Sequence, residues 1–198
     1  MTHRERILTA CRHEQPDRVP LQVYLTPEIH QKLVEYFGDQ DLMEIFGIDL
    51  RGVGAPYTAE LKPGPGMPGK ADSYDEFGVG YSAQAYEGGV YYEASELALK
   101  PLKTTAEVDA YPWPSAENFD YSVLPAQCEA LGEYATCLGG AGIPDILNGV
   151  SRWRGMEQVM VDIAMQNPVG VGIIDHRVDY FYEYCKFALE AAGGKIDI

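Results

Sequence analysis

Apolar residues recur at helical spacing from the start of the chain, and the first such run predicts a helix that ends near His13. Thr2 and Glu5 have the spacing of a capping box, in which the hydroxyl and the carboxylate each accept an amide at the helix start. Ile7 and Cys11 then lie on one face of that helix.

A second helix is predicted between Thr26, which caps it, and Gly38, which ends it, with Pro27 in its first turn. A short helix over 41–46 follows and stops at Gly47. The expected buried face of the second helix consists of its large apolar residues, Ile29, Leu33, Tyr36 and Phe37.

Helical spacing returns later in the chain, over 124–132, over 156–163 and in a long helix that begins at Pro168 and ends before Gly193. Four short apolar-rich runs alternate with the helices and are expected to be strands: 19–25, 48–53, 134–138 and 195–198. Strands separated by helices predict an α/β fold with parallel strands, as in half of a (β/α)8 barrel.

The middle of the chain has a different pattern. Segment 62–69 is rich in proline and glycine and predicts a loop. The runs 78–86 and 90–94 flank the turn sequence Glu87-Gly88-Gly89 and predict a β-hairpin, which we place in an insertion over 72–96. The hairpin tyrosines suit ordinary packing on a pleated sheet, with stacking on a flat ligand or a subunit contact as alternatives: Tyr81, Tyr86, Tyr91 and Tyr92.

The composition is that of a soluble globular protein with a strongly acidic net charge. Of 198 residues 46% are apolar, and 30 acidic against 15 basic residues give a formal charge of −15. The basic residues are scattered, so we expect neither nucleic acid nor a membrane as a partner. The amino terminus has no signal-like apolar core, and the cysteines have no metal-ligand spacing, which favours a cytoplasmic location.

Several short motifs together point to one family. The segment Arg12-His13-Glu14-Gln15-Pro16-Asp17-Arg18-Val19-Pro20 is the most specific of them. Others are Asp75–Val79, Pro101-Leu102, Tyr111–Pro114 and Arg154–Glu157. With these motifs the chain resembles the uroporphyrinogen decarboxylase-like superfamily, which also contains cobalamin-dependent methyltransferases, and the matches span nearly its whole length.

The resemblance implies a TIM barrel whose substrate enters at the carboxyl ends of the strands. The chain would be a single domain over 1–198, equivalent to about the first four βα units and truncated after the fourth strand. We therefore expect it to be inactive alone, and to associate with itself or with a complementing chain.

The resemblance also suggests site residues. True decarboxylases carry an arginine-rich run after the first strand, where this chain reads Tyr24-Leu25-Thr26-Pro27-Glu28, and this difference disfavours porphyrinogen decarboxylation. The decarboxylases' pyrrole-binding aspartate is matched by Asp49. We predict Asp49 as catalytic, with a structural hydrogen bond to a loop amide as the alternative, and Tyr24, Arg51 and Gly140 as substrate-binding residues.

In the methyltransferase branch, a zinc ion held by a His-x-Cys pair and a distant cysteine activates a thiol to accept a methyl group. Those ligands fall in the second half of the barrel, so we expect no metal or cofactor in this chain, and zinc with a corrinoid partner in the complete protein. Cys137 and His176 are interpreted as structural residues.

The complete protein is therefore expected to be an enzyme of the corrinoid-dependent methyltransferase type, acting on a small-molecule or corrinoid-protein substrate. Two alternatives stay open. One is uroporphyrinogen III decarboxylase of porphyrin biosynthesis, and the other is a non-catalytic half-barrel or truncated product.

Overall fold

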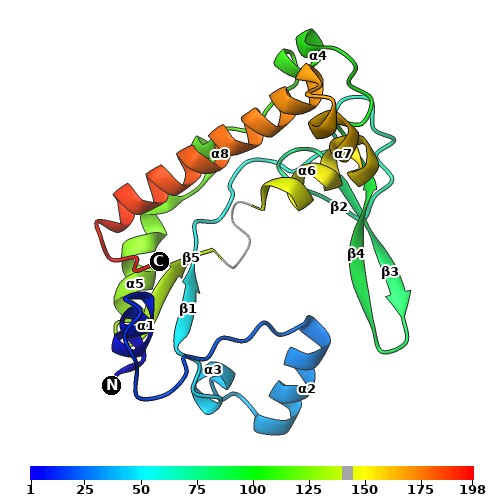
Figure 1. Ribbon diagram of the computed structural model, residues 1–198. Coiled ribbons are helices and arrows are strands. Elements are labelled where there is room, and N and C mark those ends of the chain that lie inside the picture. Colours follow the sequence, from blue (N-terminus) through cyan, green and yellow to red (C-terminus); the bar gives the residue numbers. More distant parts are fainter. Residues whose placement is uncertain (140–144) are drawn as a thin grey trace. The chain divides into compact units, whose positions relative to one another are not determined.

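The computed structural model describes residues 1–139 and 145–198 of the chain, which fold as two compact units (Figure 1). Each unit is assembled from segments that are distant in sequence. Unit 1 consists of Met1–Pro56, Tyr121–Ala141 and Phe187–Ile198, and unit 2 of Tyr57–Asp120 and Gly142–Lys186.

Unit 1 is built around the parallel pair of strands β1 and β5, which are in register from Leu50 opposite Ala135 to Val53 opposite Leu138. The short helices α1 and α5 contact this pair, and the end of the long helix α8 also belongs to the unit. The elements are α1 (His3–Cys11), α2 (Pro27–Phe37), α3 (Leu42–Ile45), β1 (Leu50–Val53), η2 (Tyr121–Val123), α5 (Leu124–Ala130) and β5 (Ala135–Leu138).

The helix starts in unit 1 confirm the predicted caps. Thr2 and Glu5 form both bonds of the capping box at α1, and the Thr26 hydroxyl accepts the amide of Ile29 at α2. The Asp41 carboxylate accepts two amides at the start of α3. Local sequence therefore determines where these helices begin.

Strand β5 is hydrogen-bonded on both sides. On the side away from β1, the Leu138 amide donates to the Ile198 carbonyl at 2.9 Å, and the Ile198 amide donates to the Thr136 carbonyl at 3.0 Å. This is the bonding pattern of a parallel pair. Segment 195–198 thus lies beside β5 as expected, although it is too briefly paired to form a regular strand.

The predicted strand over 19–25 is wrong. The segment forms no regular ladder, and a single backbone bond, from the Asp49 amide to the Leu21 carbonyl at 2.9 Å, joins it to the start of β1. Tyr24 is 87% exposed. The run is apolar enough for a strand, but Pro20 provides no amide for a ladder, and four of its side chains are exposed: Val19, Leu21, Gln22 and Tyr24.

The predicted buried face of α2 is also wrong. No residue of this helix is buried, and Tyr36 is 83% exposed. The element that α2 chiefly contacts is α3, which is only about one turn long. A helix with an apolar stripe needs a wider surface than this to bury it.

The core of unit 1 lies where α5 and the end of α8 meet the β1–β5 pair. Val53 from β1 and Leu124 and Cys128 from α5 are buried against Ala188 and Ala192 of α8. Small residues on α8 allow its backbone to approach the other elements closely. This core packs against both β1 and β5 and holds the strand pair in place.

Unit 2 contains an antiparallel sheet and most of the remaining helices. The predicted hairpin is confirmed as β3 and β4, with Gly88 at a φ of 104° in the turn, and the short strand β2 extends it to three strands (Figure 1). The elements are β2 (Ser73–Tyr74), β3 (Gly80–Tyr86), β4 (Gly89–Glu96), α4 (Thr105–Asp109), η1 (Ala116–Asn118), α6 (Ile146–Arg154), α7 (Met156–Ala164) and α8 (Pro168–Ala192).

Aromatic rings form the centre of unit 2. Phe77 is 3% exposed, and its ring lies 4.0 Å from the ring of Trp153 and 4.9 Å from that of Tyr180, between ring centres. Arg154 and Asp162 form a buried ion pair nearby. Three of the hairpin tyrosines are about half exposed or more: Tyr86, Tyr91 and Tyr92. The rings of Tyr86 and Tyr91 lie 6.0 Å apart between ring centres.

The chain therefore has a mixed α/β fold, with a small parallel sheet in one unit and an antiparallel sheet in the other. The described residues contain no closed barrel. Within residues 1–139 and 145–198, no helix is both long and apolar enough to cross a membrane.

Candidate functional site

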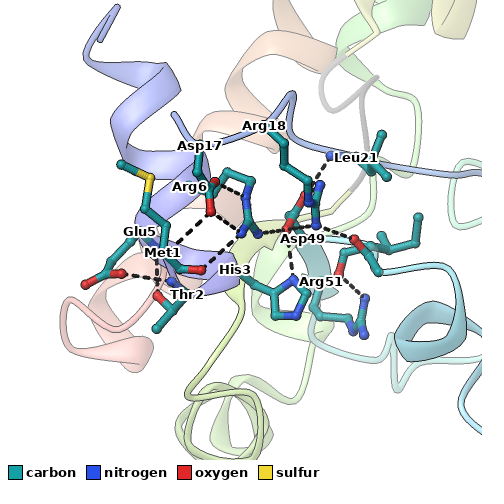
Figure 2. Close-up of polar contacts among 12 residues, drawn as sticks. Met1, Thr2, His3, Glu5, Arg6, Asp17, Arg18, Leu21, Asp49 and Arg51 are labelled. Atoms are coloured by element: carbon teal, nitrogen blue, oxygen red, sulfur yellow. Dashed lines mark hydrogen bonds and ion pairs between the residues drawn. The ribbon is translucent and has the colours of Figure 1, made fainter. Parts of the chain in front are cut away.

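Asp49 lies at the centre of a buried ionic network in unit 1 (Figure 2). Its side chain is fully buried, and its two oxygens accept hydrogen bonds from His3, Arg6, Arg18 and the Leu21 amide at 2.6–2.9 Å. Such a set of donors occupies the acceptor positions of a carboxylate. The charge of Asp49 is thus fully compensated.

The network joins the motif over 12–20 to α1 and to the start of β1. Arg18 belongs to the motif over 12–20, and so does Asp17, which accepts two hydrogen bonds from Arg6 at 2.6 and 3.0 Å. Asp49 directly precedes β1. The motif therefore fastens α1 and the segment after it to the amino end of β1.

These contacts control the charge of Asp49. Burial alone would raise the pKa of its carboxyl, but the hydrogen bonds from the Leu21 amide, His3 and the two arginines outweigh burial and lower the pKa to about 2. Asp49 is ionised at neutral pH. It lies at the end of β1 opposite to the carboxyl end, so its geometry favours the structural alternative to the predicted catalytic role.

A cavity of about 430 Å³ opens beside the β1–β5 pair and extends to the carboxyl ends of both strands. We call it the β1/β5 cavity. Two predicted substrate-binding residues, Tyr24 and Arg51, line it. Its wall also includes Gly52 and Gly139, which leave main-chain atoms open to a ligand. The structure thus brings Tyr24 and Arg51 to one site, and Asp49 lies outside this lining.

Arg51 is an unusual lining residue because its guanidinium is buried, with 9% of the residue exposed. Nη1 donates to the Ile48 carbonyl at 2.9 Å, and the guanidinium carbon lies 3.9 Å from the centre of the Tyr134 ring. Nη2 is buried and has no hydrogen-bond partner. Nη2 forms an ion pair with Asp41 Oδ2 at 3.7 Å, a distance beyond that of a hydrogen bond.

The remaining predicted residues have different outcomes. Gly140 lies outside the described residues. Cys137 lines the β1/β5 cavity, but burial raises the pKa of its thiol, which keeps it protonated at neutral pH. His176 is stacked on Trp113 at 4.2 Å between ring centres, in unit 2. Among the residues that the structure describes, no cluster of His, Cys, Asp and Glu is arranged to hold a metal ion.

Sequence reasoning missed a second group of buried and half-buried charges, in unit 2. Burial raises the pKa of Asp75 to about 6 and also raises that of Glu76. Arg177 is 8% exposed, and its guanidinium lies 4.6 Å from the centres of both the Trp153 and the Phe181 rings. The motif over 75–79 marked this region, but only the three-dimensional packing shows that its carboxylates are withdrawn from water.

Comparison of the chain with family models, with curated proteins and with solved structures finds no match.

Proposed function

We propose that the chain is part of an enzyme of the uroporphyrinogen decarboxylase-like superfamily, of the corrinoid-dependent methyltransferase type in its complete form. We propose further that the substrate binds in the β1/β5 cavity. The motif resemblance is one support, because its most specific segment, 12–20, provides Asp17 and Arg18 to the ionic network at the start of β1.

A partial barrel is supported by the order of the backbone contacts. Segment 19–25 contacts the start of β1, β1 pairs with β5, and β5 is bonded to segment 195–198. The neighbours in space therefore follow the order of the chain, which is the order in a (β/α)8 barrel. In folds of this class, ligands bind at the carboxyl ends of the strands, where the β1/β5 cavity lies.

The observation that carries the proposed site is the buried Nη2 of Arg51, which has no hydrogen-bond partner and only a long ion pair with Asp41. A buried guanidinium N–H without a partner costs free energy that an acceptor from a ligand would recover. Guanidinium groups bind carboxylate, phosphate and sulfonate oxygens through paired N–H donors. We therefore infer that Arg51 binds an anionic group of the substrate, in a chain whose net charge of −15 otherwise repels anions.

The number of cationic groups favours one branch of the superfamily. Among the described residues that line the cavity, Arg51 is the sole cationic side chain. Uroporphyrinogen carries several carboxylates, and each would need a partner. One guanidinium suits a substrate with one anionic group, which supports the methyltransferase type over the decarboxylase.

The test is a titration of the whole chain with acetate, phosphate and methanesulfonate, followed by the amide NMR signals of Gly52 and Gly139. We expect saturable shifts that disappear in Arg51→Gln and persist in the control Arg12→Gln, which changes an exposed arginine of the same unit. Shifts that persist in Arg51→Gln would refute the site.

A second titration, with the stable oxidised compound uroporphyrin, distinguishes the branches. We expect it to bind no more tightly than acetate does. Binding that is much tighter than that of the one-charge probes would contradict the methyltransferase type and favour the decarboxylase.

A further inference from the structure

Unit 2 contains a cavity of its own, of about 480 Å³, which we call the Trp113 cavity. Aromatic rings and carboxylates both line it: Tyr57, Tyr111, Trp113, Glu60 and Glu76. Its size is within the usual range of small-molecule sites. Its lining residues all belong to unit 2, so this cavity is distinct from the β1/β5 cavity.

Two of the rings form a corner of this cavity. The Tyr111 and Trp113 ring centres are 5.0 Å apart, and the ring planes meet at 61°. The polar atoms of both rings are already used, because the Tyr111 hydroxyl donates to the Phe77 carbonyl and Trp113 Nε1 donates to the Val108 carbonyl. One face of Trp113 is stacked on His176, so the parts of the two rings that line the cavity offer a ligand π-electron surface rather than hydrogen bonds.

Glu76 contributes a carboxylate that is only partly hydrated. It is half-buried, and the described residues provide it with no ion pair within 4.0 Å. Arg177 affects its charge from farther away, but that guanidinium donates to the Asp145 carbonyl and lies against Trp153. The Tyr180 hydroxyl also interacts with Glu76 and favours its charged form, but a half-buried carboxylate without a close counter-ion remains costly, and a cation in the cavity would offset this cost.

We propose that the Trp113 cavity binds a small organic ammonium ion, with the Tyr111–Trp113 corner and Glu76 as its main contacts. Aromatic faces attract cations through the ring quadrupole, and they attract ammonium ions most strongly where water is excluded. The charges agree with this choice. Glu60 and Lys62 are both exposed to water, so the half-buried Glu76 carries the charge least screened by solvent, and an anion would be repelled.

The test is a titration of the whole chain with tetramethylammonium, followed by the side-chain NMR signal of Trp113 Nε1. A parallel titration uses tert-butanol, a neutral molecule of similar shape. We expect a saturable shift with the cation and none with the alcohol. An equal response to both probes, or no saturable response to the cation, would overturn the proposal.

Variants locate the site. Glu76→Gln keeps the shape and removes the charge, and we expect it to weaken the binding of tetramethylammonium at least about tenfold. Glu93→Gln changes an exposed carboxylate on β4 of the same unit and should leave the affinity unchanged. If Glu76→Gln binds tetramethylammonium as tightly as Glu93→Gln does, the proposal fails. Arg51→Gln should leave the affinity for tetramethylammonium unchanged, whether or not the β1/β5 site exists, so the two sites can be tested separately.

Discussion

Arg18 donates hydrogen bonds to both carboxylate oxygens of Asp49, at 2.8 and 2.9 Å, across 31 residues of sequence. The second amino group of Arg18 also donates to the Gly47 carbonyl, at 2.9 Å. One guanidinium therefore fixes both the start of β1 and the turn that leads into it. The most specific motif of the sequence thus has a structural task in this chain.

We predict that Asp49→Asn destabilises unit 1 by about 3 kcal/mol or more, because an amide cannot accept from all the donors and removes the carboxylate that Arg18 pairs with, whereas Arg6 keeps its ion pair with Asp17. Urea unfolding followed by circular dichroism measures the change in the free energy of unfolding. Asp39→Asn, at an exposed carboxylate, is the control and should change it little. An Asp49→Asn protein as stable as this control, but deficient in ligand binding, would restore the catalytic interpretation.

The raised pKa of Asp75 predicts that the stability of unit 2 falls as the pH rises from about 4 to about 6. Its carboxyl has a pKa of about 6 in the folded chain against an ordinary value of 3.8, chiefly because of burial. The folded state therefore binds the proton more tightly, and this contribution to stability is present below about pH 4 and is lost as the pH rises to about 6.

Asp75→Asn should remove this loss of stability with rising pH. An amide can still accept from the Phe77 and Val79 amides through its oxygen, so the fold is retained. We expect the variant to melt at the same temperature as the wild type or higher at pH 7, with a flatter profile between pH 4 and 6. Asp109→Asn, at an exposed carboxyl, should keep the wild-type profile, and identical profiles for all three proteins would contradict the prediction.

Two glycines of α8 make a matched pair. A Cβ at position 170 would lie 2.2 Å from Cβ of Asp162, whereas one at position 172 would lie 3.6 Å from Val108. We predict that Gly170→Ala destabilises the chain by roughly 1–3 kcal/mol through overpacking. Gly172→Ala should be neutral or stabilising by up to about 1 kcal/mol, because alanine favours a helix. Thermal unfolding measures the stability of both variants. Equal changes in stability for Gly170→Ala and Gly172→Ala would refute the prediction.

Asp197 holds segment 195–198 beside β5. Its carboxylate forms an ion pair with Arg4, which donates to both oxygens at 2.7–3.0 Å, and it accepts a hydrogen bond from the Thr136 amide at 3.1 Å. We predict that Asp197→Ala increases hydrogen exchange at the amides of Leu138 and Ile198 at least about tenfold while α8 stays protected. Unchanged exchange at these two amides would show that the segment is held by backbone bonds alone.

Features with local causes could be predicted from the sequence. The caps at Thr2 and Thr26 and the turn at Gly88 depend on residues within a few positions of each other. The sequence pattern predicts no helix at α6, although its Asp145 cap is also a local signal. Its Gly149 interrupts the helical pattern, and that glycine fits because a Cβ there would lie 2.1 Å from the Arg177 guanidinium carbon.

The site was harder to predict because its properties arise from distant contacts. Arg51 and Tyr24 could be selected from a resemblance, but the Arg51 guanidinium lies against the Tyr134 ring, which is 83 residues away in sequence. The donors to Asp49 likewise come from α1 and from the segment after it. Burial of a charge is a property of packing, and no local pattern encodes it.

The pairing of Arg4 with Asp197 joins residues that are 193 positions apart, and it has a kinetic consequence. Unit 1 can close only after segments from distant parts of the chain meet, and the entropy of that loop must be lost before the contacts form. The β3–β4 hairpin of unit 2 needs no such encounter. During refolding from urea, its strands should regain order well before β5 gains its neighbour at Ile198.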